Sequence, residues 1–314
     1  MSAVSTVNVT VPATTANLGP GFDCIGVALT LYNQFNFTTA VNATTPLTIK
    51  VKGAEADRVD TNADNLVYKT FLKLYQHLGM TPPPVEIEIL LGVPLARGLG
   101  SSATAIAGGL IGANCLAGSP LTQPEIINLA IGIEGHPDNI VPAIMGGCRL
   151  AAVNDFSVTK DKNPWQICDI PWHNNIIPIV AIPDFELSTS ASRRVLPTEY
   201  DRADTIFNTA HLGLLIRALE TGQGEWLTVA MQDKMHQPYR KKLIPGFDAV
   251  REAAINAGSY GLVISGAGPT LLALADATSN LAVEKAIAST WQQFGIKAEV
   301  RSLKPDLQGT CISF

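Results

Sequence analysis

The sequence lacks the cysteine and histidine patterns that mark a disulfide framework or a zinc site. None of its five cysteines forms a C-x-x-C pair, and its five histidines include no H-E-x-x-H motif. The cysteines are Cys24, Cys115, Cys148, Cys168 and Cys311. An odd and widely spaced set is typical of buried thiols in a reducing compartment, and disulfides are not expected.

Targeting and membrane-spanning segments are not expected either. The first basic side chain is Lys50, so no positively charged segment precedes an apolar stretch, as it would in a signal or transit peptide. The longest apolar run, Ala103 to Gly118, has 16 residues and contains Asn114 and four glycines, which is short for a membrane span. We therefore expect a cytoplasmic protein with no membrane partner.

An excess of basic charge is also missing. The 22 Lys and Arg residues are outnumbered by 27 Asp and Glu residues, which gives a net charge of −5. This balance argues against a nucleic acid as partner, while a local basic site for an anionic ligand stays open.

What is present predicts a folded α+β protein. Of the 314 residues, 46% are hydrophobic and 16% are charged, which is enough apolar material to bury a core and excludes disorder. At about 150 residues per domain, the length fits two domains. Charge and proline increase between Asn154 and Asn175, so we place the boundary there and assign residues 1–160 and 170–314 to the two domains.

Hydrophobic periodicity predicts the elements of each half. In the first half we expect strands at Val4–Val11 and Asn33–Val41 joined by a long loop at Pro12–Gly26, a helix at Asn62–Leu78, a strand from Val85, a helix ending near Leu116, and a helix that starts at Pro124 and ends near Glu134–Cys148. In the second half we expect a strand at Ile176–Ile182, helices around Asp204–Glu220 and Gly246–Ala257, strands near Leu262 and Leu271, a helix at Val283–Phe294 and a final strand.

The segment PLARGLGSSAT at residues 94–104 is the most informative one. It follows a predicted strand and opens a predicted helix, so its backbone N–H groups and the helix dipole favour an anion there. Gly98 and Gly100 allow a ligand to approach the backbone closely, and Ser101 or Ser102 is able to cap the helix. The segment lacks the lysine of a Walker A loop and the third glycine of a dinucleotide fold. A simple strand-to-helix turn with a serine cap therefore stays open.

The helix after this loop is rich in small residues. Glycines inside a helix cost stability, so we expect Gly108, Gly109 and Gly112 to allow close packing against a sheet or another helix.

The loop and five further segments, in order, resemble the GHMP small-molecule kinases, a superfamily that includes galactokinases, mevalonate kinases and homoserine kinases. The segments are PATTANLGPGFDCIGVAL near the N-terminus, EGHPDN at 134–139, STSASRRVLP at 188–197, QPYRKKLIPGF at 237–247 and SGAGPT at 265–270. Their forms are most similar to the homoserine kinase branch. The resemblance implies a two-domain GHMP kinase fold, with an N-terminal nucleotide-binding α/β domain and a C-terminal ferredoxin-like α/β sandwich domain.

The resemblance also implies ATP and Mg²⁺ as cofactors. The ATP loop would consist of Pro94, Leu95, Ala96, Arg97, Gly98, Leu99, Gly100, Ser101, Ser102, Ala103 and Thr104. The metal ligands would be Ser102 and Glu134, since a hydroxyl and a carboxylate suit an octahedral magnesium shell.

The acceptor implied by the resemblance is L-homoserine, a zwitterion with a side-chain hydroxyl, which would be converted to O-phospho-L-homoserine in threonine biosynthesis. The residues implied for substrate binding are Asn17, Asp23, His136, Asn139, Thr189, Arg193 and Arg240. The arginines suit the carboxylate and Asp23 suits the ammonium. Asn139 and Arg240 are also expected at the transfer step, with Asp138 as a hydrogen-bonding residue or a base. A homodimer is expected from the same resemblance.

Alternatives stay open at the level of single residues. Arg193 is equally compatible with an exposed surface pair, Asp23 with a turn, Arg240 with a basic patch and His136 with a structural hydrogen bond. For the whole chain, the alternatives are a mevalonate-type kinase and a non-catalytic sensor that binds a metabolite or nucleotide.

Overall fold

The computed structural model describes residues 5–40, 45–155 and 163–314, so residues 156–162 of the expected boundary lie outside the described part. The strands are β1 Thr6–Asn17, β2 Gly21–Thr39, β3 Leu47–Lys52, β4 Val85–Leu90, β5 Cys148–Val153, β6 Trp165–Ile170, β7 Ile177–Pro183, β8 Gly261–Ile264, β9 Leu271–Ala275, β10 Ala298–Ser302 and β11 Cys311–Ser313. The helices are α1 Leu66–Leu78, α2 Ser101–Leu116, α3 Gln123–Glu134, α4 Pro137–Met145, α5 Thr189–Arg194, α6 Arg202–Thr221, α7 Gly224–Ala230, α8 Gln237–Arg240, α9 Phe247–Asn256 and α10 Asn280–Gln293, with short 3₁₀ turns at Ala56–Arg58 and Lys241–Leu243.

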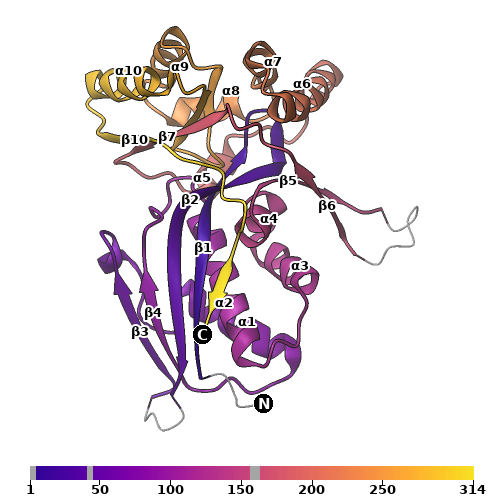
Figure 1. The fold of residues 1–314 in the computed structure, drawn as a ribbon, viewed down its shortest axis with the longest axis vertical. Coiled ribbons are helices and arrows are strands. Elements are labelled where there is room, and N and C mark those ends of the chain that lie inside the picture. The colour runs from indigo at the N-terminus through magenta and orange to yellow at the C-terminus, as the bar shows by residue number, and fades with distance from the viewer. Residues whose placement is uncertain (1–4, 41–44, 156–162) are drawn as a thin grey trace.

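The first sheet has the order β11-β1-β2-β4-β3, and β2 also pairs with β5, which pairs with β6. All of these pairs are antiparallel except β3 with β4. The helices α1 to α4 lie on one side of this sheet (Figure 1). Valines and phenylalanines of β1 and β2 form a common core with them.

The second sheet is antiparallel, with the order β10-β7-β9-β8. With α9 before β8 and α10 before β10, this is the βαββαβ arrangement expected for a ferredoxin-like domain. Alternate residues of β7 point to opposite faces of this sheet, and both faces are covered by other parts of the protein. Ile179 and Ala181 pack with α9 and α10, whereas Val180 and Ile182 pack with α6, α7 and the strands of the first half.

The two halves therefore share one core cluster. Ala13 and Leu29 of the first sheet lie in the same cluster as Leu272 and Leu274 of the second. The proposed boundaries at residues 160 and 170 stay a prediction. In the structure, the later strands β6 and β11 pair within the first sheet. No helix in the described ranges is both long and apolar enough to span a membrane.

The expectation of a long loop at Pro12–Gly26 is wrong. Strand β1 continues to Asn17 and β2 begins at Gly21, so the two form a tight hairpin. Pro12 lacks a backbone N–H and is accommodated where the register of the pair shifts, between Pro12 and Ala13. The sequence prediction failed because the proline and glycines of this segment were interpreted as loop signals.

A second helix at the EGHPDN segment was also missed. Helix α3 ends at Glu134, Gly135 takes a left-handed conformation, and α4 starts at Pro137. A proline at the first helical position is favourable, because its missing N–H has no intrahelical partner there.

The prediction for the small-residue helix is confirmed. A Cβ at Gly108 would lie 2.4 Å from the ring of Phe35, and one at Gly112 would lie 2.3 Å from the ring of Phe37. Both rings belong to β2. The glycines thus let α2 approach the sheet closely enough to pack against aromatic rings.

Candidate active site

A cavity of about 520 Å³ lies between the two halves and contains nearly all the predicted site residues. Its lining includes Asn17, Asp23, Leu95, Ala96, Arg97, Gly98, Gly100, Ser101, Ser102, Glu134, His136, Asp138, Asn139, Thr189, Arg193 and Arg240. Four predicted ATP-loop residues do not line it. Leu99, Ala103 and Thr104 are buried beneath the loop, and Pro94 lines a neighbouring groove.

The glycine loop is shaped by left-handed backbone at Gly98 (φ 81°) and Gly100 (φ 67°). Gly100 occupies the N-cap position of α2 and no side chain caps the helix, so the expected serine cap is wrong. Ser101 and Ser102 instead form the first helical turn, and the N–H groups there are free of side-chain caps.

The turn at Ser265–Thr270 holds this loop from the second half. The Ser265 hydroxyl donates to the Gly98 carbonyl at 2.6 Å, and the Thr270 N–H donates to the Arg97 carbonyl at 3.1 Å. A Cβ at Gly98 would lie 2.4 Å from the Ser265 carbonyl oxygen. This turn therefore fixes the shape of the glycine loop through one hydroxyl, one backbone N–H and close packing on Gly98.

Glu55 supports the other end of the loop and was not found from the sequence. Its carboxylate accepts from the Leu95 N–H and the Arg97 guanidinium, each at 2.7 Å. Burial alone would raise the pKa of Glu55, but these hydrogen bonds and the charges of Arg97 and Arg58 lower it overall. No sequence motif marks Glu55, because only the fold brings the end of β3 beside the loop.

Ser102 and Glu134 lie together, although they belong to different helices. The Ser102 hydroxyl donates to Oε2 of Glu134 at 2.5 Å. The two groups are adjacent oxygen atoms of the kind that magnesium prefers as ligands, and they lie beside the N-terminal end of α2.

Asp138, His136 and Asn139 form a hydrogen-bonded group at the start of α4. The Oδ1 atom of Asp138 is 2.6 Å from Nδ1 of His136 and accepts from Nδ2 of Asn139 at 3.1 Å. Burial lowers the pKa of His136, but its hydrogen bond to Asp138 and the surrounding carboxylates raise it overall. The buried Thr14 hydroxyl donates to Oδ1 of Asn139 at 2.7 Å and fixes the orientation of that amide.

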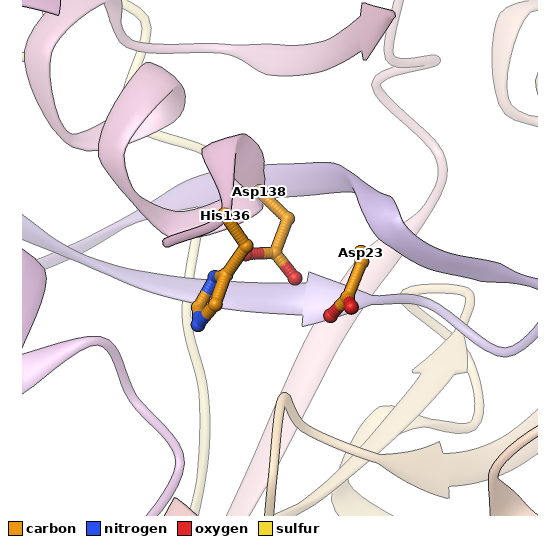
Figure 2. Close-up of side chains that lie close together, drawn as sticks. All are labelled: Asp23, His136 and Asp138. Atoms are coloured by element: carbon orange, nitrogen blue, oxygen red, sulfur yellow. The ribbon is translucent and has the colours of Figure 1, made fainter. Parts of the chain in front are cut away.

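Figure 2 shows Asp23, His136 and Asp138 around one small space, with their polar atoms within 4.8 Å of one another. Asp23 comes from the β1–β2 hairpin, Asp138 from the first turn of α4, and His136 from the N-cap position before that helix. Two carboxylates, a histidine and the nearby arginines thus face one space, which offers partners for groups of either charge.

The two predicted arginines face this space from the second half. Arg193 forms a bidentate ion pair with Asp23, at 2.9 and 3.0 Å. Arg240 is 2% exposed, and its guanidinium donates to the carbonyls of Ser192 and Gly266. Burial lowers the pKa of Arg240. The ring of Phe22 lies 5.9 Å from the Arg193 guanidinium and 5.1 Å from that of Arg240.

Asn17 lines the cavity, but its side chain is used within the protein. Its Nδ2 donates to the Gly266 carbonyl at 2.9 Å, and its Oδ1 accepts from the Asp23 N–H at 3.0 Å. Asn17 and Asp23 both have positive φ, at 73° and 57°. Asn17 thus helps to hold Asp23 in an uncommon backbone conformation at the cavity wall.

A glycine loop joins a strand to the N-terminus of a helix, and carboxylates and arginines lie beside it in the same cavity. This arrangement is that of a small-molecule phosphotransferase. The family model described as "GHMP kinases N terminal domain" matches residues 65–147, and "GHMP kinases C terminal" matches residues 215–297. The chain belongs to the GHMP kinase family.

The more specific relatives are homoserine kinases. The chain is 64% identical to the homoserine kinase of Trichormus variabilis over 98% of this chain and 99% of that protein. It is 59% identical to that of Trichodesmium erythraeum over the full length of both chains. The crystal structure of homoserine kinase from Cytophaga hutchinsonii matches with a TM-score of 0.86 and 27% identity, covering 100% of this chain and 99% of that one.

Proposed function

We propose that this chain transfers the γ-phosphoryl group of ATP to the side-chain hydroxyl of L-homoserine, which gives O-phospho-L-homoserine for threonine biosynthesis. The observation that carries the proposal is the single cavity that combines the glycine loop with Asp23, Arg193 and Arg240. The 53–64% identity to homoserine kinases over nearly the whole chain supports the same acceptor.

The donor side of the cavity is the glycine loop and the start of α2. The free N–H groups after Gly100 and the positive end of the helix dipole bind the phosphates. The cavity continues past the loop to apolar side chains that include Val59, Leu66 and Leu91, and these suit the adenine ring.

Ser102 and Glu134 are the residues that would hold Mg²⁺, and their adjacent oxygens fit this hard cation. The ion, when bound, neutralises charge on the phosphates. The transfer itself passes through a loose transition state, so catalysis depends mainly on positioning and charge stabilisation.

The acceptor side is suited to a zwitterion. Arg193 and Asp23 neutralise each other as an ion pair at the cavity wall. Homoserine brings both a carboxylate and an ammonium, so it separates this pair and leaves each charge with a new partner. Arg193 and Arg240 bind the carboxylate, and Asp23 binds the ammonium. A substrate with a carboxylate alone, such as mevalonate, would leave Asp23 without a counter-charge.

The transfer step uses Asn139 to orient the acceptor hydroxyl, and Arg240 stabilises charge close to the transferring group. Because Thr14 donates to Oδ1 of Asn139, the amide Nδ2 is directed to donate hydrogen bonds. Asp138 holds Asn139 and His136 in place. The phosphoryl group itself takes the proton of the hydroxyl, so no dedicated base is required.

A turnover assay with ATP, Mg²⁺ and three acceptors tests the proposal. Phosphorylation of L-homoserine in clear preference to mevalonate and galactose is expected. Turnover of mevalonate instead would favour a mevalonate-type kinase. Thermal stabilisation by ATP and Mg²⁺ with no turnover of any acceptor would favour a sensor.

The remaining assignments belong to the same proposal. The enzyme works as a homodimer in the cytoplasm, with no nucleic acid or membrane as partner. Size-exclusion chromatography with light scattering checks the dimer, and a monomer at micromolar concentration would contradict it.

A further inference from the structure

His236 is a buried histidine that the transfer step does not use. Its side chain is 0% exposed and lies just before α8, next to the cavity but outside its lining. The Nε2 atom is 2.8 Å from the carbonyl oxygen of Gly19, and the Nδ1 atom is 3.4 Å from Nη1 of Arg240. The ring therefore connects the β1–β2 turn of the first half with a substrate-facing arginine of the second.

The two contacts determine which nitrogen carries the proton. A carbonyl oxygen only accepts hydrogen bonds, so Nε2 is protonated. A guanidinium only donates, so Nδ1 offers its lone pair and the ring is neutral. Burial, assisted by the charge of Arg240, lowers the pKa of His236 against the opposing effect of Asp233. This direction agrees with the neutral ring.

The carboxylate of Asp233, which lies near the His236 ring, has hydrogen-bond partners other than that ring. Its carboxylate accepts from the backbone N–H groups of Met235, His236 and Gln237 and from the Asn208 amide. Its Oδ2 atom is 3.6 Å from Nε2 of His236, farther than the Gly19 carbonyl. Asp233 therefore holds the backbone before α8, while the histidine proton goes to Gly19.

Arg240 needs hydrogen-bond partners within the protein because its guanidinium is almost completely buried. Nε donates to the Ser192 carbonyl at 3.3 Å, and Nη1 donates to Gly266 at 3.0 Å and faces His236. Within the described part of the chain, Nη2 has no hydrogen-bond partner. The ring of Phe22 lies beneath the guanidinium and also stacks on His236 with a centroid distance of 5.2 Å. Nη2 is therefore the group left for a ligand in the cavity.

We propose that His236 is a positioning residue for the amino-acid substrate: its neutral ring, anchored on the Gly19 carbonyl, accepts from Nη1 of Arg240 and so directs Nη2 toward the cavity. This inference rests on the proposed function, in which Arg240 binds the homoserine carboxylate. Homoserine binding would therefore depend on the contact between His236 of the second half and Gly19 of the first.

Two substitutions separate the two ring contacts. His236→Gln keeps an N–H donor near the Nε2 position but offers no acceptor at Nδ1, whereas His236→Asn keeps an oxygen near Nδ1. We expect His236→Gln to raise the homoserine KM about tenfold or more, the usual effect of losing a hydrogen bond to a charged group. His236→Asn should recover most of this loss. The ATP KM should stay within about twofold for both variants.

His211→Gln is the matched control. His211 also contacts a carbonyl, that of Phe207 at 2.7 Å, but it lies on α6 outside the cavity lining. This variant should leave both KM values unchanged. The inference is overturned if His236→Gln leaves the homoserine KM unchanged, if His236→Asn is no better, or if both KM values rise together.

Combination with Arg240→Ala distinguishes this inference from the proposed function. If His236 acts through Arg240, His236→Gln should change kcat/KM by less than about twofold in the Arg240→Ala background. A full additional loss there would refute the positioning role and leave the proposed function intact. An unchanged homoserine KM in Arg240→Ala alone would instead refute the carboxylate assignment.

A measurement on the unmodified protein does not depend on how the variants fold. Nitrogen-15 NMR of the histidine rings at neutral pH should show one buried ring protonated at Nε2 only. A His236 ring that is protonated at Nδ1, or at both nitrogens, would overturn the inference.

Discussion

Arg193 and Asp23 are 170 residues apart in the sequence and form a bidentate ion pair at the wall of the cavity. Arg193 lies in the last turn of α5, and Asp23 lies just after the β1–β2 turn. The pair brings together the two charges that an amino-acid substrate requires, one from each half of the molecule.

This pair predicts a selective loss of acceptor binding on substitution. We expect Arg193→Ala to raise the homoserine KM about tenfold to a hundredfold, because a charge-assisted bidentate contact is lost and Asp23 is left unpaired. The KM for ATP should stay nearly unchanged. Steady-state kinetics with each substrate varied in turn measures both. Thr189→Ala, at the start of the same helix but uncharged, is a comparison variant that should cause a smaller loss. Equal rises in both KM values would argue against a carboxylate site.

Asp138→Asn tests whether a dedicated base is present. The amide keeps an oxygen that is able to accept from His136 and Asn139, so the hydrogen-bonded group should persist. We expect this variant to retain more than about one hundredth of the wild-type turnover, whereas losing an essential base costs up to about 10⁴-fold. Single-turnover measurement with saturating ATP and homoserine gives the relevant rate. A loss near 10⁴ would mean that Asp138 removes the proton of the hydroxyl.

Gly112→Ala should destabilise the protein although alanine is the better helix former. A Cβ there would lie 2.3 Å from the ring of Phe37, so the helix or the ring must move, at a cost of about 1–3 kcal/mol. Gly132→Ala in α3 is the matched control, since nothing lies within 4 Å of its added Cβ. It should stabilise the protein by about 0.5–1 kcal/mol. Urea unfolding of both variants measures the difference, and a stabilised Gly112→Ala would contradict the packing argument.

Cys24 should resist alkylation although it lies beside the site. Burial and the carboxylates of Asp138 and Asp23 raise the pKa of its thiol to about 11. Because the thiolate is the reactive form, labelling by iodoacetamide should be very slow at pH 8 and should increase as the pH rises toward 11. Cys168 and Cys311 are exposed and should react first. Peptide mass spectrometry at several pH values follows each cysteine, and rapid labelling of Cys24 at pH 8 would contradict the raised pKa.

The sequence determined the elements whose cause is local. The helix predicted at Asn62–Leu78 follows from its apolar spacing and ends as expected before Gly79, a left-handed C-cap. Its start was placed four residues too early, because Asn65 is the N-cap and the helix begins at Leu66. The glycine turn before α2 was predictable for the same reason, because Gly98 and Gly100 adopt the left-handed backbone that favours glycine. The six ordered motifs also supplied the predicted site residues, most of which line the cavity, but other parts of its wall, such as Val59, Leu66 and Leu91, lie outside these motifs.

Only the tertiary structure decided how those residues act on one another. The pairing of β1 with β2 converts an apparent loop at Pro12–Gly26 into a hairpin that carries Asp23. Glu55 lies outside every motif, His236 directly precedes one, and Thr14 lies within the N-terminal motif but was not singled out. These three residues nevertheless hold Arg97, Arg240 and Asn139, respectively. Such contacts join segments that are distant in the chain, so local propensity and spacing carry no information about them. Their geometry follows from the packing of the two sheets around a shared core.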